Sequence, residues 1–166
     1  MANVTLRGLS RAVLRRFAER RELRIYAISR ESIRALPRHH HCLRDAWGDL
    51  AFLDAWSYEN LTRDQYVETA STRRREGIHH LYSLVENGVL IHYGWVSYPQ
   101  LRAPDAALGL EFIPPPGSAV LWDYSTHPSA RGRGLYLKTL WQCLHDAVEI
   151  DGAKHAFIYV YADNPV

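Results

Sequence analysis

A strand, a helix and a second strand follow one another within residues 118–165, and this order constrains the fold more than any other feature of the chain. The first run, AVLWDYST, is rich in β-formers and ends at Pro128, and the last, HAFIYVY, precedes Asn164. Between them, Gly152 ends a helix whose apolar residues recur at helical spacing. These residues are Leu137, Leu140, Trp141, Leu144 and Val148. Two strands joined through one helix form a parallel pair with a right-handed crossover.

Residues 78–99 predict an antiparallel hairpin, because two β-rich runs flank Asn87-Gly88. Residues 62–77 predict a helix that Gly77 ends, and residues 23–29 predict a first strand. A hairpin combined with a parallel pair requires a mixed sheet. We therefore expect an α/β (α+β) fold with a mixed, mainly antiparallel central sheet and flanking helices.

Three other stretches give simpler expectations. Residues 1–22 carry an apolar stripe with arginines largely outside it, which predicts an amphipathic helix with a basic outer face. Residues 101–118 contain four prolines and predict a surface loop. Arg73, Arg74 and Arg75 lie in the last turn of the helix at 62–77, where a solvated face would complement the helix dipole.

Composition sets the class of protein. A chain of 166 residues is long enough for one globular domain with its own core, and a net charge of +2 is too small to indicate a nucleic-acid partner. We see no secretory leader and no apolar run that would span a membrane. Cys42 and Cys143 are too few for a disulfide framework, so we expect a cytoplasmic protein with reduced thiols.

A metal site is not expected. The run RHHHC at residues 38–42 contains good zinc ligands, but adjacent histidines do not converge on one ion from a regular element, and no distant pair has ligand spacing. Cys143 lies within the long helix, one position from its apolar stripe. This position indicates a buried, inert thiol rather than a nucleophile.

The loop ARGRGLY at residues 130–136 has the composition of an anion site. Backbone N–H groups at the start of a helix have no intrahelical partner, and Gly132 and Gly134 let an anion approach the backbone. Arg131 and Arg133 add positive charge. No Gly-Lys-Ser/Thr follows and a third glycine is missing, so the loop is neither a Walker loop nor a dinucleotide fingerprint. A tight turn with solvated arginines explains the residues equally well.

In its place between strand and helix, the run from Thr126 to Leu135 resembles the acetyl-coenzyme-A motif of the GNAT superfamily of N-acetyltransferases. In that motif a strand ends at a proline, and a Gln/Arg-x-x-Gly-x-Gly/Ala loop opens the next helix. The order of elements over residues 23–166 is similar to that family as well. The resemblance implies one GNAT-like acyltransferase domain over residues 1–166, in which residues 118–165 bind acetyl-CoA and the loop holds its pyrophosphate.

The resemblance also implies the reaction: a primary amine of a small molecule or peptide attacks the acetyl-CoA thioester directly, without a metal. Strand alternation predicts that Leu121, Asp123 and Ser125 share one face and that Trp122, Tyr124 and Thr126 share the other. Asp123 is our first choice for the base, although a structural role for this acid agrees equally well. The expected catalytic residues are Asp123, Tyr124 and His127, with Glu111 and Tyr161 as lesser candidates. The expected coenzyme-binding residues are Ser125, Thr126, Arg131, Gly132, Arg133, Gly134, Leu135, Tyr136 and Asn164.

The chain departs from the family pattern at two points. Tyr136 stands where the family usually has Gly or Ala. Family members normally continue past the Asn-Pro region through another helix and two strands, and that helix often carries a tyrosine that acts as general acid. A truncated sequence, a partner subunit that completes the fold and a replaced acid all agree with an end at Val166. We expect residues 155–163 to be an open sheet edge that pairs with missing sequence or with a second copy in a homodimer.

Two other functions agree with the same residues. One is an N-acyltransferase that takes a longer chain from an acyl carrier protein, which the basic residues at 7–21 and 73–75 would attract. The other is a catalytically silent GNAT-like module that binds a nucleotide-bearing ligand or another protein.

Overall fold

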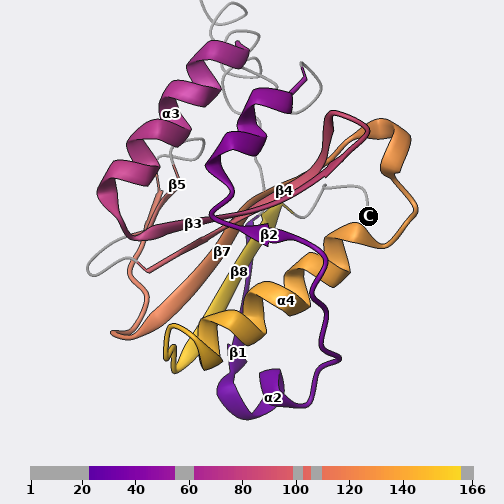
Figure 1. Ribbon diagram of the computed structural model, residues 1–166. Coiled ribbons are helices and arrows are strands. Elements are labelled where there is room, and N and C mark those ends of the chain that lie inside the picture. The colour runs from indigo at the N-terminus through magenta and orange to yellow at the C-terminus, as the bar shows by residue number, and fades with distance from the viewer. Residues whose placement is uncertain (1–22, 55–61, 99–102, 106–109, 162–166) are drawn as a thin grey trace, which may run out of the picture. The chain divides into compact units, whose positions relative to one another are not determined.

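The computed structural model describes residues 23–54, 62–98, 103–105 and 110–161 (Figure 1). The chain divides into a larger unit, Ile25–Tyr159, and a smaller one made of Met1–Arg24 and Val160–Val166. In the smaller unit the described residues are the first two of strand β1 and the last two of strand β8. The helix expected at residues 1–22 lies outside the described residues.

A six-stranded sheet forms the centre of the fold, in the order β1-β8-β7-β4-β3-β2. Neighbouring strands from β2 to β7 are antiparallel, and β7 pairs with β8 in parallel from Ser118 opposite His155 to Leu121 opposite Ile158. The expectation of a mixed, mainly antiparallel sheet is therefore confirmed. The strands are β1 Leu23–Ser29, β2 Leu43–Arg44, β3 His79–Glu86, β4 Val89–Ser97, β7 Ser118–Thr126 and β8 His155–Tyr161.

The hairpin of β3 and β4 turns at Asn87-Gly88, as expected. Both residues have positive φ, 52° and 73°, which is the geometry of a type I′ turn. The register of the pair shifts between Leu84 and Val85, and Ile91 is the extra residue on β4. The turn holds Glu86 beside the loop that follows β7, a contact that matters for the site.

The helices follow their local signals closely. Helix α3, Arg63–Glu76, begins with a capping box between Thr62 and Gln65, and the left-handed Gly77 ends it. Helix α4 spans Leu135–Glu149 and begins after Gly134, whose φ is 70°. The shorter elements are α2 Arg30–Arg34 and the 3₁₀ turns η1 Trp47–Phe52 and η2 Pro128–Ala130, none of which the sequence analysis anticipated.

The helices cover opposite faces of the sheet (Figure 1). On one face, Leu81 and Trp95 pack in a core cluster with Tyr66 and Ala70 of α3. On the other, the hydroxyl of Tyr82 donates a hydrogen bond to Asp146 of α4 at 3.0 Å. Because neighbouring residues of a strand point to opposite faces, Leu81 and Tyr82 assign α3 and α4 to the two sides.

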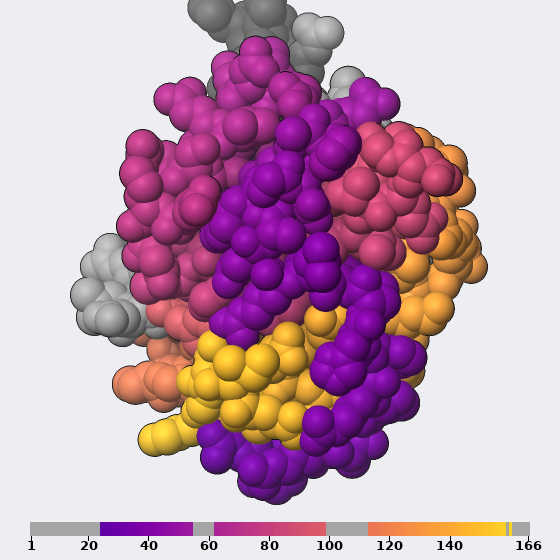
Figure 2. Space-filling view, viewed as in Figure 1, coloured from indigo at the N-terminus to yellow at the C-terminus, as the bar shows by residue number. Residues whose placement is uncertain are grey.

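The segment that contains RHHHC packs across α4 (Figure 2). His39 stacks on Trp141 with ring centroids 5.2 Å apart, and His41 Nε2 lies 3.0 Å from the Thr139 hydroxyl. The amide of Gln142 accepts from the backbone N–H of Cys42. Among the described residues, no group of three His, Cys, Asp or Glu side chains converges as metal ligands do.

Two expectations about the sheet are wrong. Residues 155–163 were expected to leave an open edge, but β8 lies between β7 and β1, so β1 of the same chain covers that edge. The argument for a second copy at this edge therefore does not hold. Residues 101–118 were expected to be loop throughout, but Ala103–Asp105 (β5) pairs with Leu110–Phe112 (β6) in a two-stranded sheet. Strands of three residues are too short to give a periodic signal.

None of the helices in the described ranges has the length and apolar character needed to cross a bilayer.

Candidate functional site

The loop between β7 and α4 is tightly folded. The backbone N–H of His127 donates to the carbonyl of Ile91 at 2.8 Å, which fixes the end of β7 against β4. The turn η2 follows, and Ala130 N–H bonds the His127 carbonyl. Gly132 and Gly134 have φ of 76° and 70°, a left-handed conformation that L side chains adopt rarely. The glycines therefore allow the chain to enter α4 directly from the strand.

This geometry leaves a set of N–H groups directed away from α4. The first intrahelical bond runs from Lys138 N–H to the Gly134 carbonyl at 3.2 Å. The N–H groups of Leu135, Tyr136 and Leu137 precede it, and no acceptor in the described part of the chain bonds them. The positive end of the helix dipole lies at the same place. The start of α4 can therefore hold an anion.

The two arginines of the loop differ in their contacts. Arg133 forms a bidentate pair with Glu86 of the hairpin, at 2.9 and 2.7 Å, and this pair holds the pKa of Glu86 below its usual value. Arg131 is exposed, and its Nε lies 3.5 Å from the Thr126 carbonyl. Glu86 therefore neutralises Arg133, whereas Arg131 forms no ion pair with a carboxylate in the described part of the chain.

The Tyr124 ring packs against the backbone of β4 at Gly94, on the α4 side of the sheet. A Cβ at Gly94 would lie 2.3 Å from its ring, and Tyr136, which is 39% exposed, meets the ring edge-on at 5.4 Å. The Tyr124 oxygen is buried next to the Cys143 thiol and makes no hydrogen bond of ordinary geometry with a described residue. Burial raises the pKa of Tyr124 well above its usual value, so the hydroxyl keeps its proton.

A bulge in β7 overturns the expected alternation of side chains. Asp123 has φ 51°, and the β4–β7 register shifts opposite Gly94, between Tyr93 and Trp95. As a result Trp122 and Asp123 both contact Arg73 of α3, whereas Tyr124 faces α4. The expectation that Trp122 and Tyr124 share a face is wrong, because one left-handed residue changes the phase of the strand.

Arg73 is the site residue that the sequence analysis missed. Its guanidinium donates to Asp123 at 2.7 Å and lies over the rings of Trp95 and Trp122, at 4.5 and 4.2 Å. The side chain is only 14% exposed, so the expected solvated face is wrong for this arginine. Position in the last helical turn agreed with solvation, and no local signal marks the aromatic rings that meet Arg73 from β4 and β7.

Asp123 also accepts a hydrogen bond from Tyr66 of α3, whose hydroxyl lies 3.1 Å away and in turn accepts from Trp95 Nε1 at 3.0 Å. Burial raises the pKa of Tyr66 well above its usual value. Asp123 and Tyr124, adjacent in sequence, therefore lie in different networks on opposite faces of the sheet.

The remaining expected residues are only partly brought together. His127 Nδ1 lies 2.7 Å from the Ser129 hydroxyl, and the Thr126 hydroxyl lies 2.8 Å from Nδ1 of the buried His92. Ser125 pairs with Tyr93 across the sheet. The side chains of Glu111 and Tyr161, and the whole of Asn164, lie outside the described residues.

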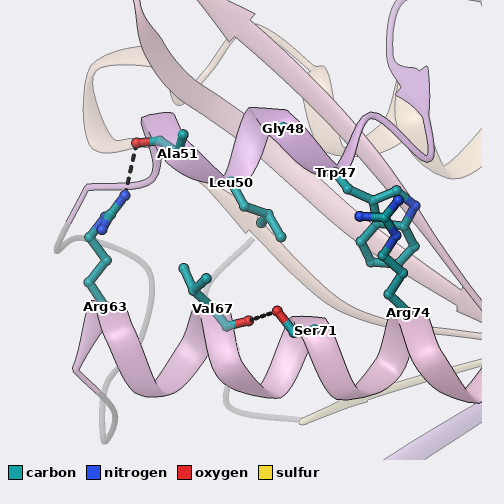
Figure 3. Close-up of a pocket in the computed structure, with 8 residues that line it drawn as sticks. All are labelled: Trp47, Gly48, Leu50, Ala51, Arg63, Val67, Ser71 and Arg74. Atoms are coloured by element: carbon teal, nitrogen blue, oxygen red, sulfur yellow. Dashed lines mark hydrogen bonds between the residues drawn. The ribbon is translucent and has the colours of Figure 1, made fainter.

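A separate groove of about 300 Å³ lies between η1 and α3 (Figure 3). Arg63 donates to the carbonyls of Ala51 and Leu53, and Arg74 lies over the Trp47 ring at 5.5 Å. Both guanidinium groups thus hold η1 on α3. The groove is lined by Trp47, Gly48, Leu50, Ala51, Arg63, Val67, Ser71 and Arg74.

Neither cysteine is expected to react with a thiol reagent while the protein is folded. Burial raises the pKa of Cys42 to about 11, and burial also raises the pKa of Cys143. The thiolate is the reactive form, and both side chains are buried. Ellman's reagent at pH 8 should therefore label both thiols in denaturant and neither under native conditions. Rapid labelling of either thiol in the native protein would contradict its burial.

Comparison with solved structures identifies the fold. AAC(6')-Iy, in complex with the bisubstrate analogue CoA-S-monomethyl-acetylneamine, matches with a TM-score of 0.50 and 14% identity, over 86% of this chain and 82% of that one. A putative GNAT-family acetyltransferase from Novosphingobium aromaticivorans matches with a TM-score of 0.52 and 14% identity, over 87% and 56%. A GNAT-family acetyltransferase from Colwellia psychrerythraea matches with a TM-score of 0.53 and 13% identity, over 86% and 48%.

The chain therefore has the fold of the GNAT N-acetyltransferases. It spans about half the length of the Novosphingobium and Colwellia proteins and most of AAC(6')-Iy. No protein-family model matches the chain, and no curated protein matches it in sequence.

Proposed function

We propose that this protein is an N-acetyltransferase that moves an acetyl group from acetyl-CoA to a primary amine, and that residues 118–165 bind the coenzyme. The observation that carries the proposal is the start of α4, where three N–H groups without a described acceptor follow a loop with two left-handed glycines. The GNAT fold of the chain supports it, since in that fold the corresponding loop holds a pyrophosphate.

In this proposal the N–H groups of Leu135, Tyr136 and Leu137 bind the pyrophosphate, and Arg131 adds its charge. Arg133 supports the loop through Glu86. Ser125 and Thr126 lie in the strand beside which the thioester would run, and His127, Gly132 and Gly134 shape the approach. Asn164 remains a proposed coenzyme contact.

The chemistry needs one bond made and one broken. The lone pair of the amine attacks the thioester carbonyl carbon, the C–S bond breaks, and an amide and the coenzyme thiolate result. The amine loses a proton, for which the carboxylate of Asp123 is the proposed acceptor, and the thiolate gains one. His127, which stands at the loop, is the proposed donor. Tyr124 keeps its proton as a donor must, but its oxygen is buried against α4, on the opposite face of the sheet from Asp123, which makes it the weaker candidate.

Substitution of Gly134 tests the loop with a matched pair of variants. Asn and Asp both tolerate a left-handed φ and both cap a helix, so Gly134→Asn and Gly134→Asp should fold alike. Only aspartate adds a negative charge beside the pyrophosphate. A unit charge at about 4 Å is worth on the order of 4 kcal/mol near a protein surface before salt screening. We expect calorimetry to show coenzyme A binding about 100-fold weaker in Gly134→Asp than in Gly134→Asn.

Release of coenzyme A across a panel of amines tests the reaction itself. We expect turnover with at least one amine, and we expect Gly134→Asp to reduce it by raising the KM for acetyl-CoA. Equal coenzyme A affinity in the two variants would overturn the loop assignment. Binding of coenzyme A without turnover on any amine would instead support a catalytically silent module.

A further inference from the structure

The ion pair between Arg73 and Asp123 uses one terminal nitrogen of the guanidinium and one oxygen of the carboxylate, and leaves their other polar atoms available. A guanidinium and a carboxylate usually pair through two parallel hydrogen bonds, but here the distance of 2.7 Å joins one terminal nitrogen of Arg73 to Oδ2 of Asp123. The other Arg73 nitrogens and Asp123 Oδ1 bond no described residue, and they are not sealed from solvent. The pair thus presents free donors next to a free acceptor.

Aromatic rings hold this pair in a fixed position. Arg73 lies over Trp95 and Trp122, and each of these rings is hydrogen-bonded in turn, Trp95 to the Tyr66 hydroxyl at 3.0 Å and Trp122 to the Ser97 hydroxyl at 2.6 Å. Tyr66 completes the ring of contacts by donating to Asp123. Two groups fixed in this way lose little side-chain entropy when a ligand binds.

Exposure and charge restrict what such a pair can recognise. The side chains of Arg73 and Asp123 are 14% and 26% exposed, so a solute can reach them. The two charges cancel, so the pair does not attract a ligand of one charge. Asp123 would repel a phosphate, and Arg73 would repel a polyamine. A zwitterion with its carboxylate close to its ammonium group matches both charges at once.

The position of the pair connects it to the proposed reaction. Asp123 lies at the bulge of β7, the strand beside which the acetyl thioester would run, and its left-handed φ turns it toward Arg73. Strain of this kind is often kept where it places a functional group.

We propose that the acceptor is a free amino acid, whose carboxylate binds Arg73 and whose amino group binds Asp123. This inference rests on the proposed acetyl transfer and names its substrate class. The acceptor's ammonium group gives one proton to Asp123, its nitrogen attacks the thioester carbon, and the C–S bond breaks. The second proton lost by the nitrogen ends on the coenzyme thiolate. The products are an N-acetyl amino acid and coenzyme A, and the first proton passes from Asp123 to solvent.

Matched acceptors test the carboxylate without any mutation. Each amino acid differs from its carboxamide only in that group. The amine of the carboxamide is less basic, so more of it is unprotonated at neutral pH, and without a binding site for the carboxylate the carboxamide would react faster. We expect kcat/KM for the preferred amino acid to exceed that for its carboxamide about 100-fold, because a site that bonds a polar group rejects the analogue without it. Equal rates would overturn the inference and leave acetyl transfer standing.

Substitution of Arg73 provides the second test. Arg73→Met should raise the KM for the amino acid about 100-fold and change the carboxamide far less, and Arg73→Lys should fall between them. Arg75→Met is the matched control, because Arg75 lies on the exposed side of the same turn and bonds Thr72. If Arg73→Met fails to fold with Asp123 unpaired, the double variant Arg73→Met/Asp123→Asn removes that charge. Because Asp123 is the proposed base, the preference of this variant is measured as binding by calorimetry, and it should still be lost. A preference that survives in either variant would overturn the assignment.

Binding separates this inference from the proposed reaction. Calorimetry with the amino acids and their carboxamides, with and without coenzyme A, needs no turnover. Amino-acid binding that Arg73→Met abolishes, without any release of coenzyme A, would support the zwitterion site and count against acetyl transfer. Absence of both binding and turnover for all twenty amino acids would overturn the inference.

Discussion

Gly94→Ala is expected to destabilise the protein by about 3 kcal/mol, at the upper end of what overpacking costs. The new methyl group would lie 2.3 Å from the ring of Tyr124, and that ring cannot move freely. Its oxygen is buried beside Cys143, and its ring forms a T-shaped contact with Tyr136. For a chain of this length the loss corresponds to a fall in Tm of about 10 °C, measurable by circular dichroism.

Two comparisons isolate the cause. Gly48→Ala adds the same methyl group in η1 with no atom within 4 Å, and should change Tm little. In a Tyr124→Ala background, Gly94→Ala should cost less than about 1 kcal/mol, because the clashing ring is gone. A full cost in that background would show that the backbone of β4, and not the Tyr124 ring, requires glycine.

Acid is expected to remove about 3 kcal/mol of stability between pH 6.5 and pH 4 through His92 alone. Its side chain is fully buried, and burial, with a smaller contribution from His41, lowers the pKa of His92 to about 4. In the unfolded chain the pKa returns to 6.5, so within this window the unfolded state binds more protons than the folded state. Stability therefore falls as the pH drops toward 4 and loses no more through this residue below it.

Urea unfolding at several pH values measures this slope. His41 and His79 also have lowered pKa values and contribute in the same direction, so the comparison must be with a variant. His92→Asn keeps an amide that can bond the Thr126 hydroxyl but does not titrate. We expect its stability to depend clearly less on pH than that of the wild type, whatever its absolute value. Parallel curves would show that His92 is solvated in the folded state.

Elements whose signals are local can be predicted from the sequence. The positive φ of Asn87 and Gly88 made the hairpin, the capping box at Thr62 and the left-handed Gly77 bounded α3, and Gly134 opened α4. Each of these signals lies within a few residues of the structure it specifies, so no knowledge of distant contacts was needed. The proposed anion site at the loop rests on the same kind of signal.

The residues that meet across the sheet could not be predicted in this way, because their contacts depend on how the strands pack. Arg73 reaches Asp123 over 50 positions of sequence, and the bulge that turns Asp123 toward it appears only when β7 pairs with β4. Alternation along an isolated strand predicted the opposite arrangement. Likewise β1 pairs with β8, although no feature of either sequence predicts this pairing. The charge and the apolar character of a side chain limit the groups that it can bind. Which residue it contacts depends on the order and register of the strands, and these are properties of the packed sheet.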